Sequence, residues 1–280
     1  MRITRLFCSS MAAVAIAGLG MATAPAHAAI LYTGSGAGNN AGQTLAASAT
    51  FDIMGSDLIV TLTNTAAFDP NDPPDILTAL FFSIAGNPTL SRVSATLNSG
   101  STVIHGPSPA TDAGGVVGGE WTYKNGLAGA PGGATQGISS AGYGLFAPGD
   151  RFPGSNLQGP TSPDGLQYGI TTLFDLAGND NGGLAGAGLI KDSVVFDLGG
   201  LPAGFRLADL SHVSFQYGTA LTEINIPGQP HDPKPPIIGS VPEPNSLLLV
   251  VTGLAMVGLY RGRQLCRCSS PGVVSHRRLN

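Results

Sequence analysis

Residues 29–226 are predicted to form one all-β domain, an antiparallel β-sandwich or jelly-roll-like fold with long glycine-rich loops. The first observation is composition: the stretch from Ala29 to Ser240 holds 14 Asp but only two Glu, with abundant Gly, Thr and Ser. These residues suit turns and strands better than helices. The second is a series of short apolar segments with turn residues between them, at the spacing of a sandwich. The third is that no helical hydrophobic period runs long enough for an α/β crossover.

The clearest hairpin joins residues 44–53 to residues 58–63 across a turn at Gly55–Asp57. Apolar residues alternate with polar ones in its first strand, so one face should be buried. That face carries Ala47, Ala49, Phe51 and Ile53.

Residues 75–85 form the next apolar run, which leaves helix and strand both open. From Gly106 to Gly188 the chain is dense in Gly and Pro and predicts long loops with short strands between them. Residues 227–240 begin with a proline-rich stretch and predict a polyproline-II linker after the domain. The remaining strand candidates are Val93–Leu97, Glu120–Lys124, Leu166–Thr172, Ser193–Leu198 and Val213–Tyr217.

Residues 1–28 have the pattern of a secretory signal peptide. Arg2 and Arg5 precede an apolar stretch, and the small residues Ala26 and Ala28 flank His27 at its end. Signal peptidase is therefore expected to cut after Ala28. All three cysteines lie outside residues 29–240, which fits a chain that avoids thiols in an oxidising compartment.

The C-terminal region has three parts in a fixed order. Val241, Pro242, Glu243 and Pro244 form an extended segment, residues 246–260 an apolar helix, and residues 261–267 a basic cluster that includes Arg261 and Arg263. At ~1.5 Å per residue the helix is roughly 22 Å long, so it needs its flanking Tyr and Arg side chains to span a bilayer of ~30 Å. Arginines follow the helix and none lies near its start, which keeps residues 268–280 in the cytoplasm and exports everything before the helix.

This ordered triple resembles the PEP-CTERM sorting signal of bacterial surface proteins. The resemblance implies that an integral-membrane exosortase recognises Val241–Pro244, cuts near it, and releases or re-anchors the protein. It also implies that Arg261 and Arg263 belong to the signal.

Four further segments resemble those of a family of exosortase-dependent surface proteins with no assigned activity. They are Gly119–Tyr123, Gly149–Pro153, Ser162–Gly169 and Val213–Thr219. This resemblance spans roughly residues 42–226 and implies a shared domain, but no chemistry comes with it.

Charge excludes some partners. Residues 29–240 carry 16 acidic and six basic side chains, a net charge of −10, which argues against binding nucleic acid or anionic lipid head groups.

No catalytic motif stands out in the exported part of the chain. His105, His212 and His231 belong to no metal-protease pattern. Glu120 and Glu223 leave a glycoside hydrolase pair open as a minor alternative. The sequence favours a protein without enzymatic activity.

Two acidic loops offer hard oxygen ligands of the kind that extracellular calcium modules use. Neither has the twelve-residue spacing of an EF-hand, and ordinary turns are the favoured interpretation. No cofactor is therefore expected, with calcium as the alternative; its candidate ligands are Asp69, Asp72, Asp75, Asp175 and Asp180.

Trp121 and Tyr123 lie two residues apart on an expected strand, hence on one face. On an exposed sheet they could stack on the sugar rings of an extracellular polysaccharide; in a core they would be an aromatic anchor, the commoner fate of a lone Trp. The sequence thus predicts an exported structural or adhesive protein of the cell surface, extracellular matrix or biofilm. A calcium- or polysaccharide-binding module is the alternative.

Overall fold

The computed structural model describes residues 29–104, 115–147, 156–158, 165–176, 183–184 and 186–231. This part of the chain is all-β, with two sheets and three single-turn 3₁₀ helices, as the composition predicts. Its 3₁₀ turns are η1 (Pro73–Asp75), η2 (Pro131–Gly133) and η3 (Leu207–Asp209). Within these ranges no helix has the length and apolarity needed to cross a membrane. The expected signal peptide, sorting motif and C-terminal helix all lie outside the described residues.

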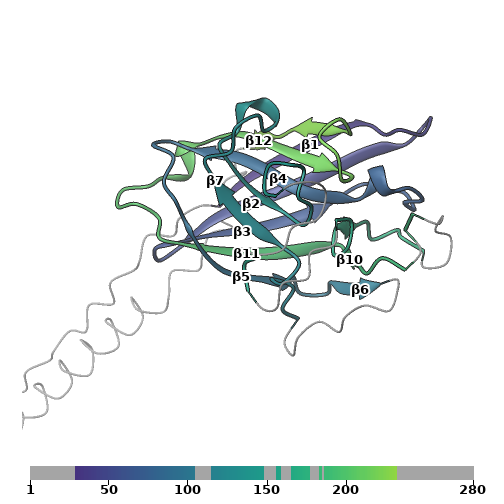
Figure 1. Ribbon diagram of the computed structural model, residues 1–280, viewed down its shortest axis with the longest axis horizontal. Coiled ribbons are helices and arrows are strands. Elements are labelled where there is room, and N and C mark those ends of the chain that lie inside the picture. Colours follow the sequence, from purple (N-terminus) through teal and green to yellow (C-terminus); the bar gives the residue numbers. More distant parts are fainter. Residues whose placement is uncertain are drawn as a thin grey trace, which may run out of the picture. The chain divides into compact units, whose positions relative to one another are not determined.

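The first sheet has six strands, and every neighbouring pair in it is antiparallel (Figure 1). In spatial order the strands are β14 (Gln229–His231), β1 (Ile30–Ala37), β2 (Thr44–Met54), β3 (Asp57–Asn64), β11 (Ser193–Gly199) and β5 (Ser91–Leu97).

The second sheet has eight strands and branches at its centre. Its main path runs through β13 (Asn225–Pro227), β12 (Leu210–Tyr217), β4 (Leu77–Ile84), β9 (Ile170–Thr171), β10 (Leu189–Lys191) and β6 (Thr102–Ile104). The branch adds β8 (Gln136–Ser139) beside β4, and β7 (Thr122–Asn125) beside β8. Only β9 and β10 pair in parallel.

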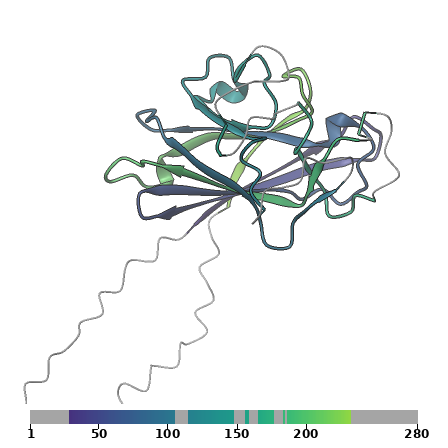
Figure 2. The same ribbon diagram turned by 60° about the horizontal axis from the view of Figure 1, so that its bottom comes forward.

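One large core joins the two sheets, an arrangement consistent with a β-sandwich (Figure 2). Its aromatic centre crosses from the first sheet to the second: the Phe51 ring contacts Tyr32 on one side and Phe82 on the other, each at 5.7 Å between ring centroids. Both contacts are edge-on, the geometry that aromatic pairs prefer.

The hairpin of β2 and β3 confirms the period-two pattern, since Ala47, Ala49 and Phe51 are buried. Strand β4 resolves the ambiguous run at residues 75–85. All eight of its residues are buried, because Leu80 and Phe82 face the main core while Ala79 and Phe81 face a smaller cluster. A strand covered on both faces reads as a continuous apolar run, so period could not separate strand from helix.

The domain extends beyond its expected end at residue 226. Pro227 belongs to β13, and residues 229–231 form β14, so the start of the expected polyproline-II linker is part of the sheets. Leu31 pairs with His231, which places the beginning of β1 beside the end of β14. The chain therefore enters and leaves the fold at the same edge of the first sheet.

Candidate functional site

The two aromatic side chains expected to stack on sugars are buried. Trp121 has no exposed surface and packs edge-on against Phe196, with ring centroids 5.0 Å apart. Tyr123 is 2% exposed. Its hydroxyl accepts the Leu90 N–H at 3.3 Å and donates to Oε1 of Gln136 at 2.9 Å, and burial raises its pKa. Neither ring presents a face to solvent, so the core interpretation replaces ligand stacking.

The acidic loops for which calcium binding was the alternative to ordinary turns meet one another in the fold. Oδ1 of Asp69 accepts the N–H of Leu176 at 2.7 Å, and the Thr172 hydroxyl donates to the carbonyl of Phe68 at 2.8 Å. Oδ2 of Asp175 accepts the Thr171 hydroxyl. The first two bonds join residues more than 100 positions apart and link the two loops through Asp69 and Thr172, whereas the Asp175–Thr171 bond spans four positions within one loop.

The remaining candidate ligands have separate partners. Oδ2 of Asp72 accepts the side-chain amide of Asn40 at 3.1 Å, whereas Asp75 is fully buried in η1. Asp180 lies outside the described residues. Among those that are described, no group of three or more His, Cys, Asp or Glu side chains could hold a metal ion.

The two glutamates considered for glycoside hydrolysis have structural surroundings. Glu120 is buried, and Oε2 of Glu223 accepts the N–H groups of Thr219 and Ala220 at 2.7 and 2.6 Å, which closes a turn after β12. Carboxylates that cleave a glycosidic bond must face one another across a groove. Neither Glu120 nor Glu223 is among the described residues that line a cavity of about 510 Å³ between strands β5 and β7.

The histidines are dispersed. His105 lies outside the described residues, and His231 is exposed in β14. His212 sits where β12 bulges, with a backbone φ of 51°, and its Nδ1 is 3.1 Å from Oγ of Ser211. It borders a cavity of about 440 Å³ together with Tyr32 and Pro230.

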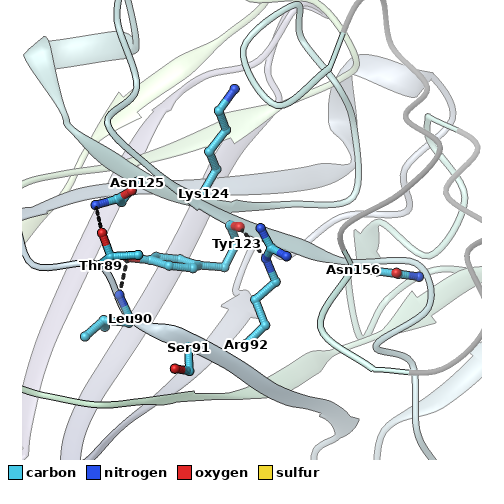
Figure 3. A pocket seen from close by; sticks show the side chains of 8 residues that line it. All are labelled: Thr89, Leu90, Ser91, Arg92, Tyr123, Lys124, Asn125 and Asn156. Atoms are coloured by element: carbon cyan, nitrogen blue, oxygen red, sulfur yellow. Dashed lines mark hydrogen bonds between the residues drawn. The ribbon is translucent and has the colours of Figure 1, made fainter.

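A polar cavity lies between the edge strands of the two sheets. Strand β5 ends the first sheet and β7 ends the branch of the second. The space between them measures about 510 Å³, within the usual range for small-molecule sites. Figure 3 shows the side chains around it, which are Thr89, Leu90, Ser91, Arg92, Tyr123, Lys124, Asn125 and Asn156.

Hydrogen bonds tie the two walls of this edge cavity together. Nε of Arg92 donates to the carbonyl of Tyr123 at 2.9 Å, and Nδ2 of Asn125 donates to Oγ1 of Thr89 at 2.7 Å. With the Leu90–Tyr123 bond, three links cross from the β5 side to the β7 side (Figure 3). These three hydrogen bonds therefore fix the two walls of the cavity relative to each other.

Of the eight residues that line the edge cavity, only Tyr123 was a candidate from the sequence. Its neighbours carry no motif: they are single Thr, Ser, Arg and Asn residues from segments more than 30 positions apart. Only the pairing of β7 with β8 and of β5 with β11 brings them together.

No family model matches the chain, and no curated protein or solved structure matches it either.

Proposed function

We propose that this chain is an exported protein of the cell surface or extracellular matrix, with the β domain as a structural or adhesive module. Signal peptidase cuts after Ala28, the apolar helix at residues 246–260 holds the intermediate in the membrane, and an exosortase acts near Pro242–Pro244. The β domain would then be a jelly-roll-like sandwich that a proline-rich linker joins to the sorting signal. The PEP-CTERM-like order of motif, helix and arginines supports the route.

The boundaries of the fold are the observation that carries this proposal. Strand β1 begins at Ile30, one residue after the expected new N-terminus at Ala29. Strand β14 ends at His231, which leaves nine residues before the sorting motif at Val241. Three prolines fall among those nine, and a polyproline-II spacer of that length would reach about 28 Å. Cleavage at both expected processing sites would therefore leave every described strand intact, which supports the proposal.

A ligand-binding role is the second candidate. The exposed aromatic platform first expected for a polysaccharide is absent at Trp121 and Tyr123, but the polar cavity between β5 and β7 offers a different kind of site. We favour binding or structural support over hydrolysis, because Glu120 and Glu223 serve separate buried or turn positions.

The proposal is tested by the mass of the mature protein recovered from the native bacterium. The expected N-terminus is Ala29 and the expected C-terminus lies within Val241–Pro244, with any extra mass there identifying the anchor. An intact chain ending at Asn280 would overturn the exosortase step and leave an ordinary tail-anchored protein.

A further inference from the structure

The edge cavity holds an unpaired positive charge in an otherwise acidic domain. Arg92 makes no ion pair with any residue that the structure describes, and none of the described residues that line the cavity is acidic. Lys124 adds little positive charge to the cavity, although it lies at the cavity wall. Figure 3 shows its side chain pointing away from Arg92, and its Nζ donates to the carbonyl of Leu145 at 2.5 Å. The charge available to a ligand is therefore that of one guanidinium.

The Arg92 guanidinium is oriented but only partly used. Its Nε bond to the Tyr123 carbonyl fixes the plane of the group, while the two Nη groups make no hydrogen bond to the described part of the chain. A planar fork with free N–H donors matches the two oxygens of a carboxylate. Because the fork is already fixed, a ligand would lose little side-chain entropy on binding.

Neutral hydroxyl and amide groups surround this fork. Among the residues that the structure describes, the Ser91 hydroxyl and Oδ1 of Asn125 have no hydrogen-bond partner, and Thr89 accepts from Asn125 while its own hydroxyl proton stays available. Such groups donate and accept equally well, as the hydroxyls of a sugar ring require. A cavity of about 510 Å³ has room for one or two sugar rings.

We propose that the edge cavity between β5 and β7 binds a carboxylated sugar, with Arg92 holding the carboxylate and Ser91, Thr89 and Asn125 holding ring hydroxyls. This deepens the adhesive role and rests on it for its setting, since an acidic polysaccharide would present such sugars outside the cell. A phosphate ligand fits less well, because phosphate sites gather several cations and backbone N–H groups whereas this cavity offers one guanidinium.

The test is calorimetric titration of the full chain, purified in mild detergent, with two matched probes. Trigalacturonate carries three carboxylates, and its methyl ester has the same rings without charge. We expect the acid to bind at least tenfold more tightly than the ester, the step that one charge-assisted bidentate contact supplies. Galacturonate monomer, as a third probe, separates capture of a single sugar acid from capture of a chain.

Two substitutions with the same charge change locate the site. Arg92→Gln should remove the preference for the acid, whereas Arg206→Gln, outside the cavity, should leave it intact. Should Arg92→Gln unfold the protein, Arg92→Lys keeps the charge but not the fork and should reduce the preference severalfold. Equal affinity for acid and ester, or an unchanged preference in both Arg92 variants, would overturn the proposal. Neither result would bear on export, which the mass of the mature protein decides.

Discussion

Asp75 is the carboxylate whose surroundings conflict most with its charge. It is fully buried, its Oδ1 has no hydrogen-bond partner among the described residues, and its Oδ2 accepts a long bond of 3.4 Å from the Asn71 N–H. Burial raises its pKa above the ordinary value, an effect that this backbone bond only partly offsets. The folded state therefore holds the Asp75 proton more tightly than the unfolded chain does.

The sign of the resulting pH dependence follows from linkage. A raised folded pKa gives a contribution to stability that is complete below the unfolded pKa and is lost as pH rises through the folded one. Asp75→Asn cannot ionise, so its free energy of unfolding should decline less between pH 4 and pH 8 than that of the wild type. Urea unfolding at a series of pH values measures this, and parallel pH profiles would contradict the assignment.

Trp121 provides a second test at a single position. Its ring is enclosed by the main core and by Phe196, so Trp121→Ala should cost about 3–5 kcal/mol of unfolding free energy through lost packing and a cavity. Phe174→Ala is the control, since that side chain is 56% exposed and its removal should change stability by less than about 0.5 kcal/mol. Equal effects of the two substitutions in denaturant titrations would mean that Trp121 is not a core residue.

Strands in which apolar and polar residues alternate could be predicted from the sequence. Strands that form because neighbouring strands pair with them, without such alternation, could not. Residues 44–53 and 58–63 pair through a short turn, so local pattern sufficed, and β5, β11 and β12 also lie where expected. By contrast β1 reads Ile-Leu-Tyr-Thr-Gly-Ser-Gly-Ala, with two glycines and no clear alternation. It is a strand because β2 and β14 pair with its two edges.

The glycines of β1 have a packing role that local pattern does not reveal. A Cβ on Gly34 would lie 2.9 Å from Cγ2 of Ile226 and 2.9 Å from the carbonyl oxygen of Pro227, both in β13. A Cβ on Gly36 would meet Ile226 only at 3.5 Å, an ordinary contact. The close approach of β1 to β13 therefore depends on Gly34 and not on Gly36.

This contrast predicts opposite outcomes for two identical substitutions on one face of one strand. Gly34→Ala should destabilise the fold by about 1–3 kcal/mol, because a backbone carbonyl cannot move aside as a side chain can. Gly36→Ala should be neutral or slightly stabilising, since it restricts the unfolded chain without a clash. Thermal unfolding of the two variants measures both effects, and similar melting temperatures would rule out the close approach at Gly34.

The edge cavity shows why the candidate site escaped the sequence. Arg92 and Tyr123 belong to different sheets, and their contact exists only when the edge strands β5 and β7 face each other. Residue type alone cannot signal such a site, because single Thr, Ser and Asn residues are also the common residues of turns. Asp69 and Asp175 were candidate ligands only as the alternative to ordinary turns, and in the fold Asp69 accepts the Leu176 N–H across a loop contact while Asp175 accepts the Thr171 hydroxyl within its own loop.

The topology of the whole domain predicts slow folding. Leu31 pairs with His231, Leu62 with Val194 and Leu80 with Phe215, so both sheets are completed by residues more than 130 positions apart. Closing such long loops costs entropy before any contact repays it. Under the proposed export route, slow folding would keep the chain unfolded while it crosses the membrane, and β14 could pair with β1 only after residue 231 had emerged. Trp121 is the single tryptophan of the sequence and is buried in the core, so its fluorescence reports on the folding of the domain. After dilution from denaturant, its fluorescence should recover on the order of seconds or longer. Recovery complete within a few milliseconds would mean that the sheets assemble from local hairpins and that distant pairing does not limit the rate.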